Sequence, residues 1–345
     1  MTGPIGVAVV GAGYWGPNLV RTFLGLPVCQ VRYVCDQRPG RLEAMREKFP
    51  HITLTDDYSE VLQDPGVEAV AIATPVSTHR ELGDRAIAAG KHVLIEKPLA
   101  STVADARALT EAAKSANRVL AVGHIFVYHP AVASLRQLVR EGLLGELCYV
   151  ASSRVNLGPP ASEVDVIWDL AVHDLSILQS LIPGNPVDVV AEGRQFVHPT
   201  LVDVAFITLR YGNGFVAHLH ASWLSPVKVR TLFLAGTLGS ATFDDAIQDG
   251  KLVISDRGED SRINLKASDT HDLFYRPGEL VRPQLEDVAP LTAECRRFLE
   301  CIVSGGRPEA DGEAGVAVVE MLEAAGQSIR EHRPVRLASV EIARA

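Results

Sequence analysis

Three glycines near the start of the chain stand at the spacing of a dinucleotide-binding turn. Gly11, Gly13 and Gly16 directly follow the apolar run at residues 5–10 and precede a helix-like segment. Glycine at these positions permits a tight bend, a close approach of the backbone to a pyrophosphate and close packing of helix on strand. The helix N-terminus then attracts the phosphate charge. The pattern predicts a site for NAD or NADP that includes Gly11, Gly13, Tyr14, Trp15 and Gly16.

An acidic residue follows the second apolar run, where such a site needs one. Asp36 lies twenty residues after Gly16. Its carboxylate can accept hydrogen bonds from the ribose hydroxyls and would repel a 2′-phosphate, so the sequence favours NAD over NADP. Arg38 could stack on the adenine ring or contact a 2′-phosphate, and this alternative stays open.

The elements that must position these residues alternate along the first part of the chain. Short apolar runs separated by amphipathic segments are typical of strand and helix units that build a parallel sheet. Strands are expected at residues 5–10, 30–35, 68–73, 92–95 and 119–122, and helices at 42–48, 79–89 and 103–115. This predicts an α/β fold with a Rossmann domain at residues 1–125.

The pattern changes after Pro130. One more helix is expected through Arg140, and long strand-like runs follow at residues 147–154, 187–196, 202–211, 215–223 and 228–234. Several alternate with period two, and the turn at residues 211–214 predicts an antiparallel hairpin. Residues 126–345 are therefore expected to form an α+β domain on a mostly antiparallel open sheet, which binds substrate and mediates assembly.

Composition and charge exclude several classes of protein. The net charge of -9 argues against binding to nucleic acid, because such proteins concentrate Lys and Arg. Five cysteines form an odd number without a CxxC pair, so neither a disulfide framework nor a zinc site is indicated. The sequence shows no signal peptide and no apolar stretch long enough to span a bilayer, so a cytoplasmic protein without a membrane partner is expected.

The order of these motifs resembles the glucose-fructose oxidoreductase, inositol dehydrogenase and MocA (Gfo/Idh/MocA) family. The resemblance covers nearly the whole chain. Its motifs are the glycine turn, Thr74-Pro75 with His79, Glu96-Lys97-Pro98, Gly123-His124, and WDLAVHDLSIL at residues 168–178. It implies an NAD-dependent oxidoreductase that acts on sugars, cyclitols or related alcohols and ketones.

The resemblance also implies roles for individual residues. Lys97 would lie between nicotinamide and substrate, and Asp169 and His173 would match the family's Asp-x-x-x-His catalytic pair. The cofactor site would extend to Thr74, Pro75, His79, Glu96 and Lys97. The sequence departs from the family pattern at Val166, Ile167 and Trp168, and at Ala171, where glycine is frequent, which affects the expected shape of the pocket.

The three catalytic candidates fit the chemistry of alcohol oxidation. Removal of a hydride leaves a hydroxyl proton that a base must accept. His173 titrates near neutral pH in its unperturbed state, and a helix over residues 169–181 would place Asp169 on the same face. Lys97 can hydrogen-bond the reacting oxygen. Whether Lys97 or His173 finally accepts the proton stays open.

The substrate is predicted to be a sugar. The sequence most resembles the branch of the family that acts on nucleotide-linked sugars, such as a UDP-N-acetylhexosamine or its uronate at C3. A diphosphate would favour cations at the pocket rim, for which Arg154, Lys228 and Arg230 are candidates. His124, Tyr128 and Asn156 are further candidates for contact with substrate.

Other interpretations stay open. An inositol or aminocyclitol dehydrogenase, or an NADP-dependent sugar 3-ketoreductase, would use the same three catalytic residues, and a non-catalytic NAD-binding regulator belongs to a different class. His218, His220 and Ser222 share one strand face, but no carboxylate stands at a suitable interval for a metal site. A row of polar side chains on an uncovered sheet face indicates a subunit interface or a solvated surface. A homodimer or homotetramer is therefore expected.

Overall fold

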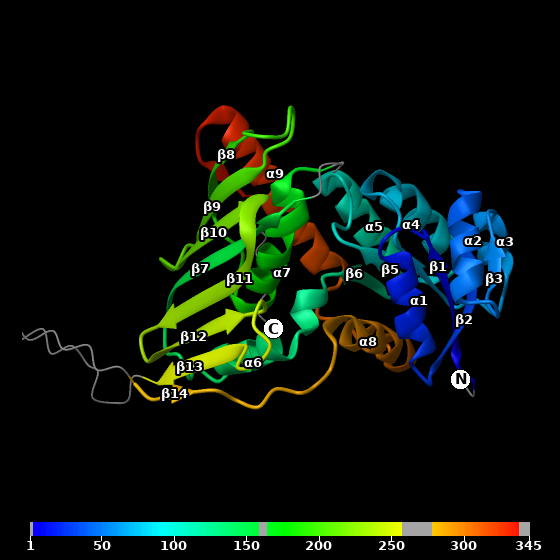
Figure 1. Ribbon diagram of the computed structural model, residues 1–345, viewed down its shortest axis with the longest axis horizontal. Helices are drawn as coiled ribbons and strands as arrows, with labels where there is room; N and C mark the ends of the chain where they lie inside the picture. The colour runs from blue at the N-terminus through cyan, green and yellow to red at the C-terminus, as the bar shows by residue number, and fades with distance from the viewer. Residues whose placement is uncertain (1–2, 159–163, 257–277, 338–345) are drawn as a thin grey trace, which may run out of the picture. The chain divides into compact units, whose positions relative to one another are not determined.

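Two separate sheets organise the chain (Figure 1). The computed structural model describes residues 3–158, 164–256 and 278–337. One unit comprises Met1–His129 and Val288–Glu323, and the other comprises Pro130–Asp287 and Ala324–Ala345. The predicted domain boundary after residue 125 lies close to His129, where the chain first leaves the first unit. The prediction assigned residues 126–345 to the second domain, whereas residues 288–323 belong to the first unit.

The first unit contains a six-stranded parallel sheet in the order β3-β2-β1-β4-β5-β6. This order is that of a doubly wound dinucleotide-binding domain, in which ligands bind at the carboxyl ends of the strands. The strands are β1 (Ile5–Val10), β2 (Cys29–Cys35), β3 (Thr53–Thr55), β4 (Ala69–Ile72), β5 (His92–Glu96) and β6 (Leu120–Gly123). All the strands predicted in this half are confirmed, and β3 is an addition.

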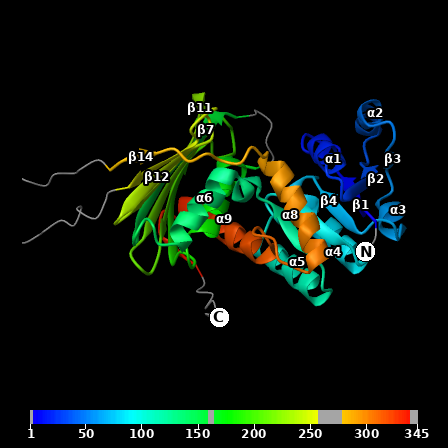
Figure 2. The same cartoon turned by 90° about the horizontal axis from the view of Figure 1, so that it is seen from below.

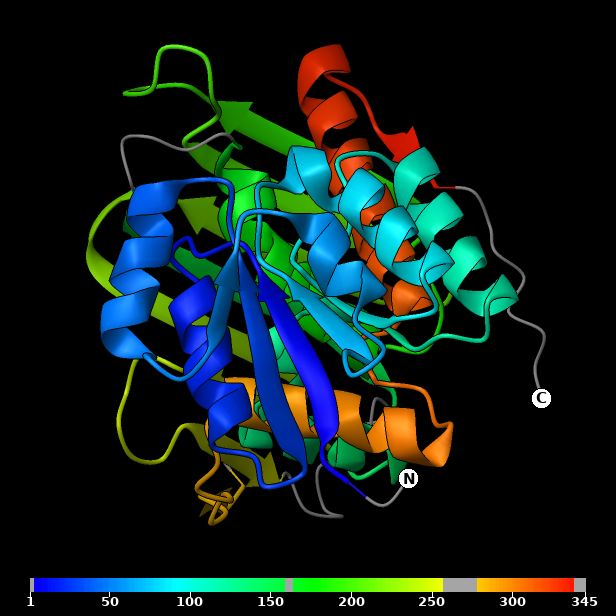
Figure 3. The same ribbon diagram turned by 90° about the vertical axis from the view of Figure 1, so that its right-hand side faces the viewer.

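Helices cover both faces of this sheet (Figure 3). The helices of the first part of the chain are α1 (Gly16–Leu24), α2 (Pro39–Lys48), α3 (Tyr58–Gln63), α4 (His79–Ala88) and α5 (Val103–Ser115). The return segment adds α8 (Pro290–Ser304), whose Phe298 and Ile302 join Phe23 of α1 in one apolar cluster with the sheet. Burial of each such side chain contributes about 2 kcal/mol. This apolar face explains why α8 belongs to the first unit.

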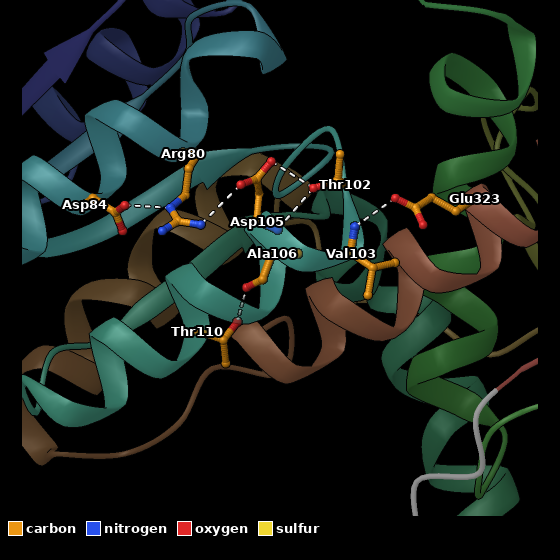
Figure 4. Close-up of polar contacts among 8 residues, drawn as sticks. All are labelled: Arg80, Asp84, Thr102, Val103, Asp105, Ala106, Thr110 and Glu323. Atoms are coloured by element: carbon orange, nitrogen blue, oxygen red, sulfur yellow. Dashed lines mark hydrogen bonds and ion pairs between the residues drawn. The ribbon is translucent and has the colours of Figure 1, made fainter.

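Helix α5 is fixed at its start by side chains from three parts of the chain (Figure 4). Thr102 accepts the backbone N–H of Asp105 at 3.1 Å, which satisfies a donor of the first turn. Glu323 of α9 (Gly312–Glu331) accepts the N–H of Val103 at 2.8 Å. Arg80 of α4 bonds the Asp105 carboxylate at 3.1 Å. These contacts tie α5 to the helices beside it.

The second unit contains a nine-stranded mixed sheet in the order β14-β13-β12-β11-β7-β10-β9-β8-β15. Only the β7–β10 pair is parallel, so the predicted open, mostly antiparallel sheet is confirmed, as is the hairpin between β9 and β10. The strands are β7 (Leu147–Leu157), β8 (Asp188–Arg194), β9 (Val204–Arg210), β10 (Val216–Ser222), β11 (Leu224–Gly236), β12 (Gly239–Asp244), β13 (Leu252–Asp256), β14 (Leu280–Val281) and β15 (Val335–Arg336).

Helices lie along one face of this sheet (Figure 2). They are α6 (Pro130–Arg140), α7 (Val172–Leu181) and the end of α9. The buried Phe215, Leu219 and Trp223 lie in the core, as predicted. The opposite face exposes Tyr149 and Phe206, and none of the described helices covers it. Within the described residues, no helix has the length and apolar character needed to cross a membrane.

Candidate active site

The glycine turn has a backbone that only glycine can adopt. Gly11 has a φ of +97°, and a Cβ there would lie 2.6 Å from the carbonyl oxygen of Ala73. A Cβ on Gly16 would lie 2.1 Å from the carbonyl oxygen of Gly11. Both distances are far below van der Waals contact, so the bend and the start of α1 require glycine. The cradle at the end of β1 thus has the shape that a pyrophosphate needs.

Asp36 is held next to this turn. The backbone N–H of Gly11 bonds the carbonyl of Cys35 at 2.8 Å, and the N–H of Ala12 bonds the Asp36 carboxylate at 2.8 Å. Arg38 Nε donates to the same carboxylate at 3.1 Å. Burial opposes ionisation, but the hydrogen bonds from Arg38 and Ala12 outweigh it and hold the pKa of Asp36 below its usual range. Asp36 is therefore a buried, ionised carboxylate paired with Arg38, and its contact with the ribose hydroxyls stays a prediction.

The remaining residues of the turn and of the loop after β4 differ in exposure. Tyr14 is 84% exposed and packs edge-on against Trp15, whose carbonyl accepts the N–H of Asn18 in the first turn of α1. The Thr74 hydroxyl lies 2.7 Å from that of Thr78, and Pro75 is exposed. These residues follow the carboxyl ends of β1 and β4, where a dinucleotide binds in this kind of fold. Their contact with the cofactor stays a prediction.

His79, predicted to contact the cofactor, is a buried residue. It is 1% exposed, with Nδ1 2.9 Å from the carbonyl oxygen of Pro98 and Nε2 2.9 Å from that of Thr74. Burial lowers the pKa of His79, although the two carbonyl oxygens oppose that change. The imidazole thus ties the loop after β4 to the loop after β5. Both ring nitrogens lie within hydrogen-bond distance of backbone carbonyl oxygens, and the contact of His79 with the cofactor stays a prediction.

Lys97 follows β5 and is half-buried, while Glu96 is buried against the neighbouring strand. One Glu96 carboxylate oxygen lies 2.9 Å from the position that a Cβ on Gly123 would take, so this side chain needs glycine on β6. The N–H of Lys97 bonds the same oxygen at 3.3 Å. Burial raises the pKa of Glu96 to about 7, and the Lys97 charge limits the rise. The Glu96 carboxyl group is therefore held by the backbone of Lys97 and affected by the charge of Lys97.

Two more candidates follow β6. His124 is 1% exposed, and burial together with the Lys97 charge lowers its pKa to about 3, so the ring is neutral. The Tyr128 hydroxyl accepts the N–H of Ala310 at 3.1 Å, and burial raises its pKa. Both residues flank or form the short helical turn η2 (Ile125–Tyr128). Their contact with substrate stays a prediction.

Asp169 and His173 lie in the second unit. Asp169 is in the helical turn just before α7, and His173 is in the first turn of α7. The sequence predicted one continuous helix, but Asp169 lies in a π-helical turn, η3 (Ile167–Ala171), and α7 begins at Val172. Such turns are rare and are frequent at functional sites. Trp223 Nε1 donates to Asp169 at 3.0 Å, and both Asp169 and His173 are half-buried. Trp223, predicted as core alone, therefore also orients Asp169.

Arg154 is not a cation at a pocket rim. Its side chain is 2% exposed, and its Nε and Nη2 atoms bond the two carboxylate oxygens of Asp174 at 2.8 and 3.1 Å. This buried pair joins β7 to α7. The prediction that Arg154 binds the diphosphate is corrected, because the fork of its guanidinium already holds a carboxylate.

We expect Arg154→Met to destabilise the protein by about 3 kcal/mol, because it leaves a buried carboxylate without its partner. Urea-induced unfolding measures the change. Arg210→Met is the matched control, since Arg210 bonds Asp188 at 2.6 Å on the same sheet but is 46% exposed. A surface pair contributes at most about 1 kcal/mol. Equal losses in both variants would contradict the structural role of Arg154.

The other predicted substrate contacts lie on β7 and β11. Asn156 is half-buried, and its amide donates to the carbonyl of Leu157 at 3.0 Å. Lys228 is exposed, and Arg230 pairs with Asp245 at 3.3 Å. Lys228 and Arg230 therefore remain the candidate cations, and their role stays a prediction.

The histidine row on β10 bonds to hydroxyl groups. His218 lies 3.0 Å from the Thr208 hydroxyl and His220 lies 3.3 Å from that of Ser153, while the Phe206 ring stacks on both imidazoles. Within the described part of the chain no group of three His, Cys, Asp or Glu residues could hold a metal ion.

Sequence reasoning missed two residues near the predicted cofactor and catalytic positions. Arg41 Nη1 lies 2.7 Å from the position that a Cβ on Gly13 would take, so this cation reaches the glycine turn. A basic residue five positions after Asp36 was the available signal. Glu294 of α8 is 1% exposed and interacts with Glu96. No sequence pattern indicated that it returns to the first sheet.

Comparison with known proteins agrees with this arrangement. Residues 5–124 match the family model described as an oxidoreductase family with an NAD-binding Rossmann fold, and residues 132–242 match the GFO/IDH/MocA C-terminal domain. Two curated relatives are a UDP-N-acetylglucosamine 3-dehydrogenase of Acidithiobacillus ferrooxidans, 34% identical over 73% of this chain and 76% of that protein, and a scyllo-inositol 2-dehydrogenase (NAD(+)) of Bacillus subtilis, 27% identical over 96% and 95%.

A solved structure supports the same assignment. The UDP-N-acetylglucosamine 3-dehydrogenase GnnA from Acidithiobacillus ferrooxidans superposes with a TM-score of 0.81 at 28% identity, covering 95% of this chain and 98% of that one. Both family domains are thus matched in order, with the glycine turn and Asp36 in the first. The chain belongs to the GFO/IDH/MocA family of oxidoreductases and is an NAD-dependent dehydrogenase.

Proposed function

We propose that this protein oxidises a secondary hydroxyl of a nucleotide-linked sugar, and that the substrate is a UDP-N-acetylhexosamine or its uronate, with reaction at C3. The observation that carries the proposal is the 34% identity to a UDP-N-acetylglucosamine 3-dehydrogenase over 73% of the chain. The exposed Lys228 and the partly exposed Arg230 of β11 support it as cations for a diphosphate.

The catalytic part of the proposal assigns separate roles to Lys97, Asp169 and His173. NAD bound at the glycine turn would accept the hydride from the carbinol carbon. Lys97 hydrogen-bonds the reacting oxygen, and its charge stabilises the developing alkoxide. The hydroxyl proton passes to Lys97 or to His173. Asp169, oriented by the Trp223 indole, fixes the imidazole of His173 in one orientation and stabilises its protonated form.

A second candidate function is oxidation of an inositol. The observation in its favour is a scyllo-inositol 2-dehydrogenase that aligns over 96% of this chain, although at 27% identity. A cyclitol has no diphosphate, so Lys228 and Arg230 would have no part in binding it. Charge reversal at these positions therefore separates the two candidates.

The test is NADH formation with a panel of UDP-N-acetylhexosamines, their uronates, free N-acetylhexosamines and inositols, with NAD or NADP. We expect kcat/KM for one UDP-sugar to exceed that for every inositol by about 100-fold, which corresponds to about 2.7 kcal/mol of additional transition-state binding. Lys228→Glu should lower this value mainly through KM. Higher kcat/KM for an inositol would support the second candidate. Tight NAD binding without turnover would support a regulator.

A further inference from the structure

Glu294 is a fully buried acid that the proposed reaction does not use. It lies on α8, is 1% exposed, and neither carboxylate oxygen has a hydrogen-bond partner among the described residues. Transfer of an unpaired carboxylate into such surroundings is very unfavourable, and in practice the group keeps its proton instead. Burial and the nearby Glu96 both raise the pKa of Glu294 well above its ordinary value.

Among the described residues, no positive charge acts on Glu294 to compensate for its ionisation. Helix α8 packs on η2, which brings Tyr128 near the carboxyl group, and on α1, whose one charged residue, Arg21, is exposed. Its neighbour on α8, Cys295, is buried, and its pKa is raised by burial and by the two acids. The charge that acts on Glu294 is that of Glu96, which has the same sign and therefore opposes the ionisation of Glu294.

Glu96 interacts electrostatically with Lys97 as well as with Glu294. The Lys97 charge favours the ionised form of Glu96 and also acts on His124, whose two ring nitrogens have no hydrogen-bond partner among the described residues. Two carboxyl groups that share a buried site do not both ionise, and they titrate as a pair. Because the positive charge of Lys97 acts on Glu96, Glu96 is the acid of the pair that ionises.

We propose that Glu294 is a positioning residue that keeps its proton, so that the buried pair of Glu96 and Glu294 carries at most one negative charge and places it on Glu96, the residue next to Lys97 in the sequence. The pair then sets the local charge beside the lysine that contacts substrate. The link to catalysis rests on the proposed function of Lys97, whereas the protonation of Glu294 does not.

The protonation of Glu294 has a signature in the pH dependence of stability. An acid whose pKa is raised by folding contributes its full stability below its unfolded pKa, and loses it as the pH rises toward the folded value. In Glu294→Gln this loss is absent. The unfolding equilibrium constant of the wild type should therefore increase relative to that of the variant as the pH rises above about 5, by up to about tenfold for each pH unit.

Urea unfolding of the full chain over this range gives the comparison without any substrate. Glu294→Met, which also cannot titrate, should show the same relative slope even if its stability is lower. Glu300→Gln is the matched control, because Glu300 is an exposed acid on the same helix, and its stability should run parallel to that of the wild type. Parallel curves for Glu294→Gln and the wild type would overturn the proposal.

The pH profile of kcat/KM tests the positioning role. Gln and Met are both neutral, as a protonated Glu294 is, so both variants should keep the inflection that follows ionisation of Glu96 at its wild-type pH. An inflection that moves to lower pH in both variants would mean that Glu294 carries a negative charge in the wild type, and would refute the proposal. A protein that turns over no sugar would refute the proposed function, while the stability comparison would still decide whether Glu294 keeps its proton.

Discussion

Lys97→Met should lower kcat/KM for the best substrate by about 10³-fold while NAD still binds. The substitution removes the charge and the hydrogen bond that we propose to the reacting oxygen, but retains most of the aliphatic volume. Acid-base catalysis by a positioned side chain contributes about 10² to 10⁴-fold, and stabilisation of a developing oxyanion adds to it. Because these interactions belong to the transition state, kcat should fall much more than KM changes.

Steady-state kinetics and NAD titration by tryptophan fluorescence measure the two effects separately. Lys114→Met is the matched control, since Lys114 is an exposed lysine near the end of α5 in the same unit, and its kcat/KM should stay within about twofold of the wild type. Retention of wild-type kcat in Lys97→Met would exclude Lys97 from the chemistry. Loss of NAD binding would instead indicate that it holds the cofactor.

The strands that build the cofactor site could be predicted from the sequence because their signal is local. The buried run of β1 ends at glycines whose roles depend on the backbone within a few residues, and Asp36 follows β2 at the expected interval. Strand β3, with three residues, is too short to carry a periodic pattern. The return of α8 depends on packing against the first sheet, which no local pattern records.

Two side-chain partners at the site could not be predicted from the sequence, for the same physical reason. Whether Arg154 faces a pocket or the core depends on the register that places it opposite Asp174, twenty residues further on. The bond from Trp223 to Asp169 joins positions 54 residues apart. Residue type suggested a cation and a core aromatic, respectively, but only the tertiary arrangement supplies their partners.

Asp36→Asn should shift the preference between NAD and NADP by about 10² to 10³-fold. In the wild type, the N–H of Ala12 donates to the Asp36 carboxylate at 2.8 Å. The amide oxygen of the introduced asparagine can accept the same hydrogen bond, so the glycine turn should keep its shape. The variant loses charge-assisted hydrogen bonds to the ribose, each contributing about 1.5–3 kcal/mol, and no longer repels a 2′-phosphate. It also releases Arg38, now paired with Asp36 at 3.1 Å, to contact that phosphate.

The ratio of kcat/KM for the two cofactors, measured at saturating substrate, reports the shift. Glu43→Gln removes an exposed negative charge from the adjacent α2 and should leave the ratio within about twofold of the wild type, because a solvated charge at the surface is screened. Combining Asp36→Asn with Arg38→Ala should restore part of the preference for NAD by removing the released cation. An unchanged ratio in Asp36→Asn would mean that the ribose is bound elsewhere, and that the carboxylate serves only to hold the glycine turn.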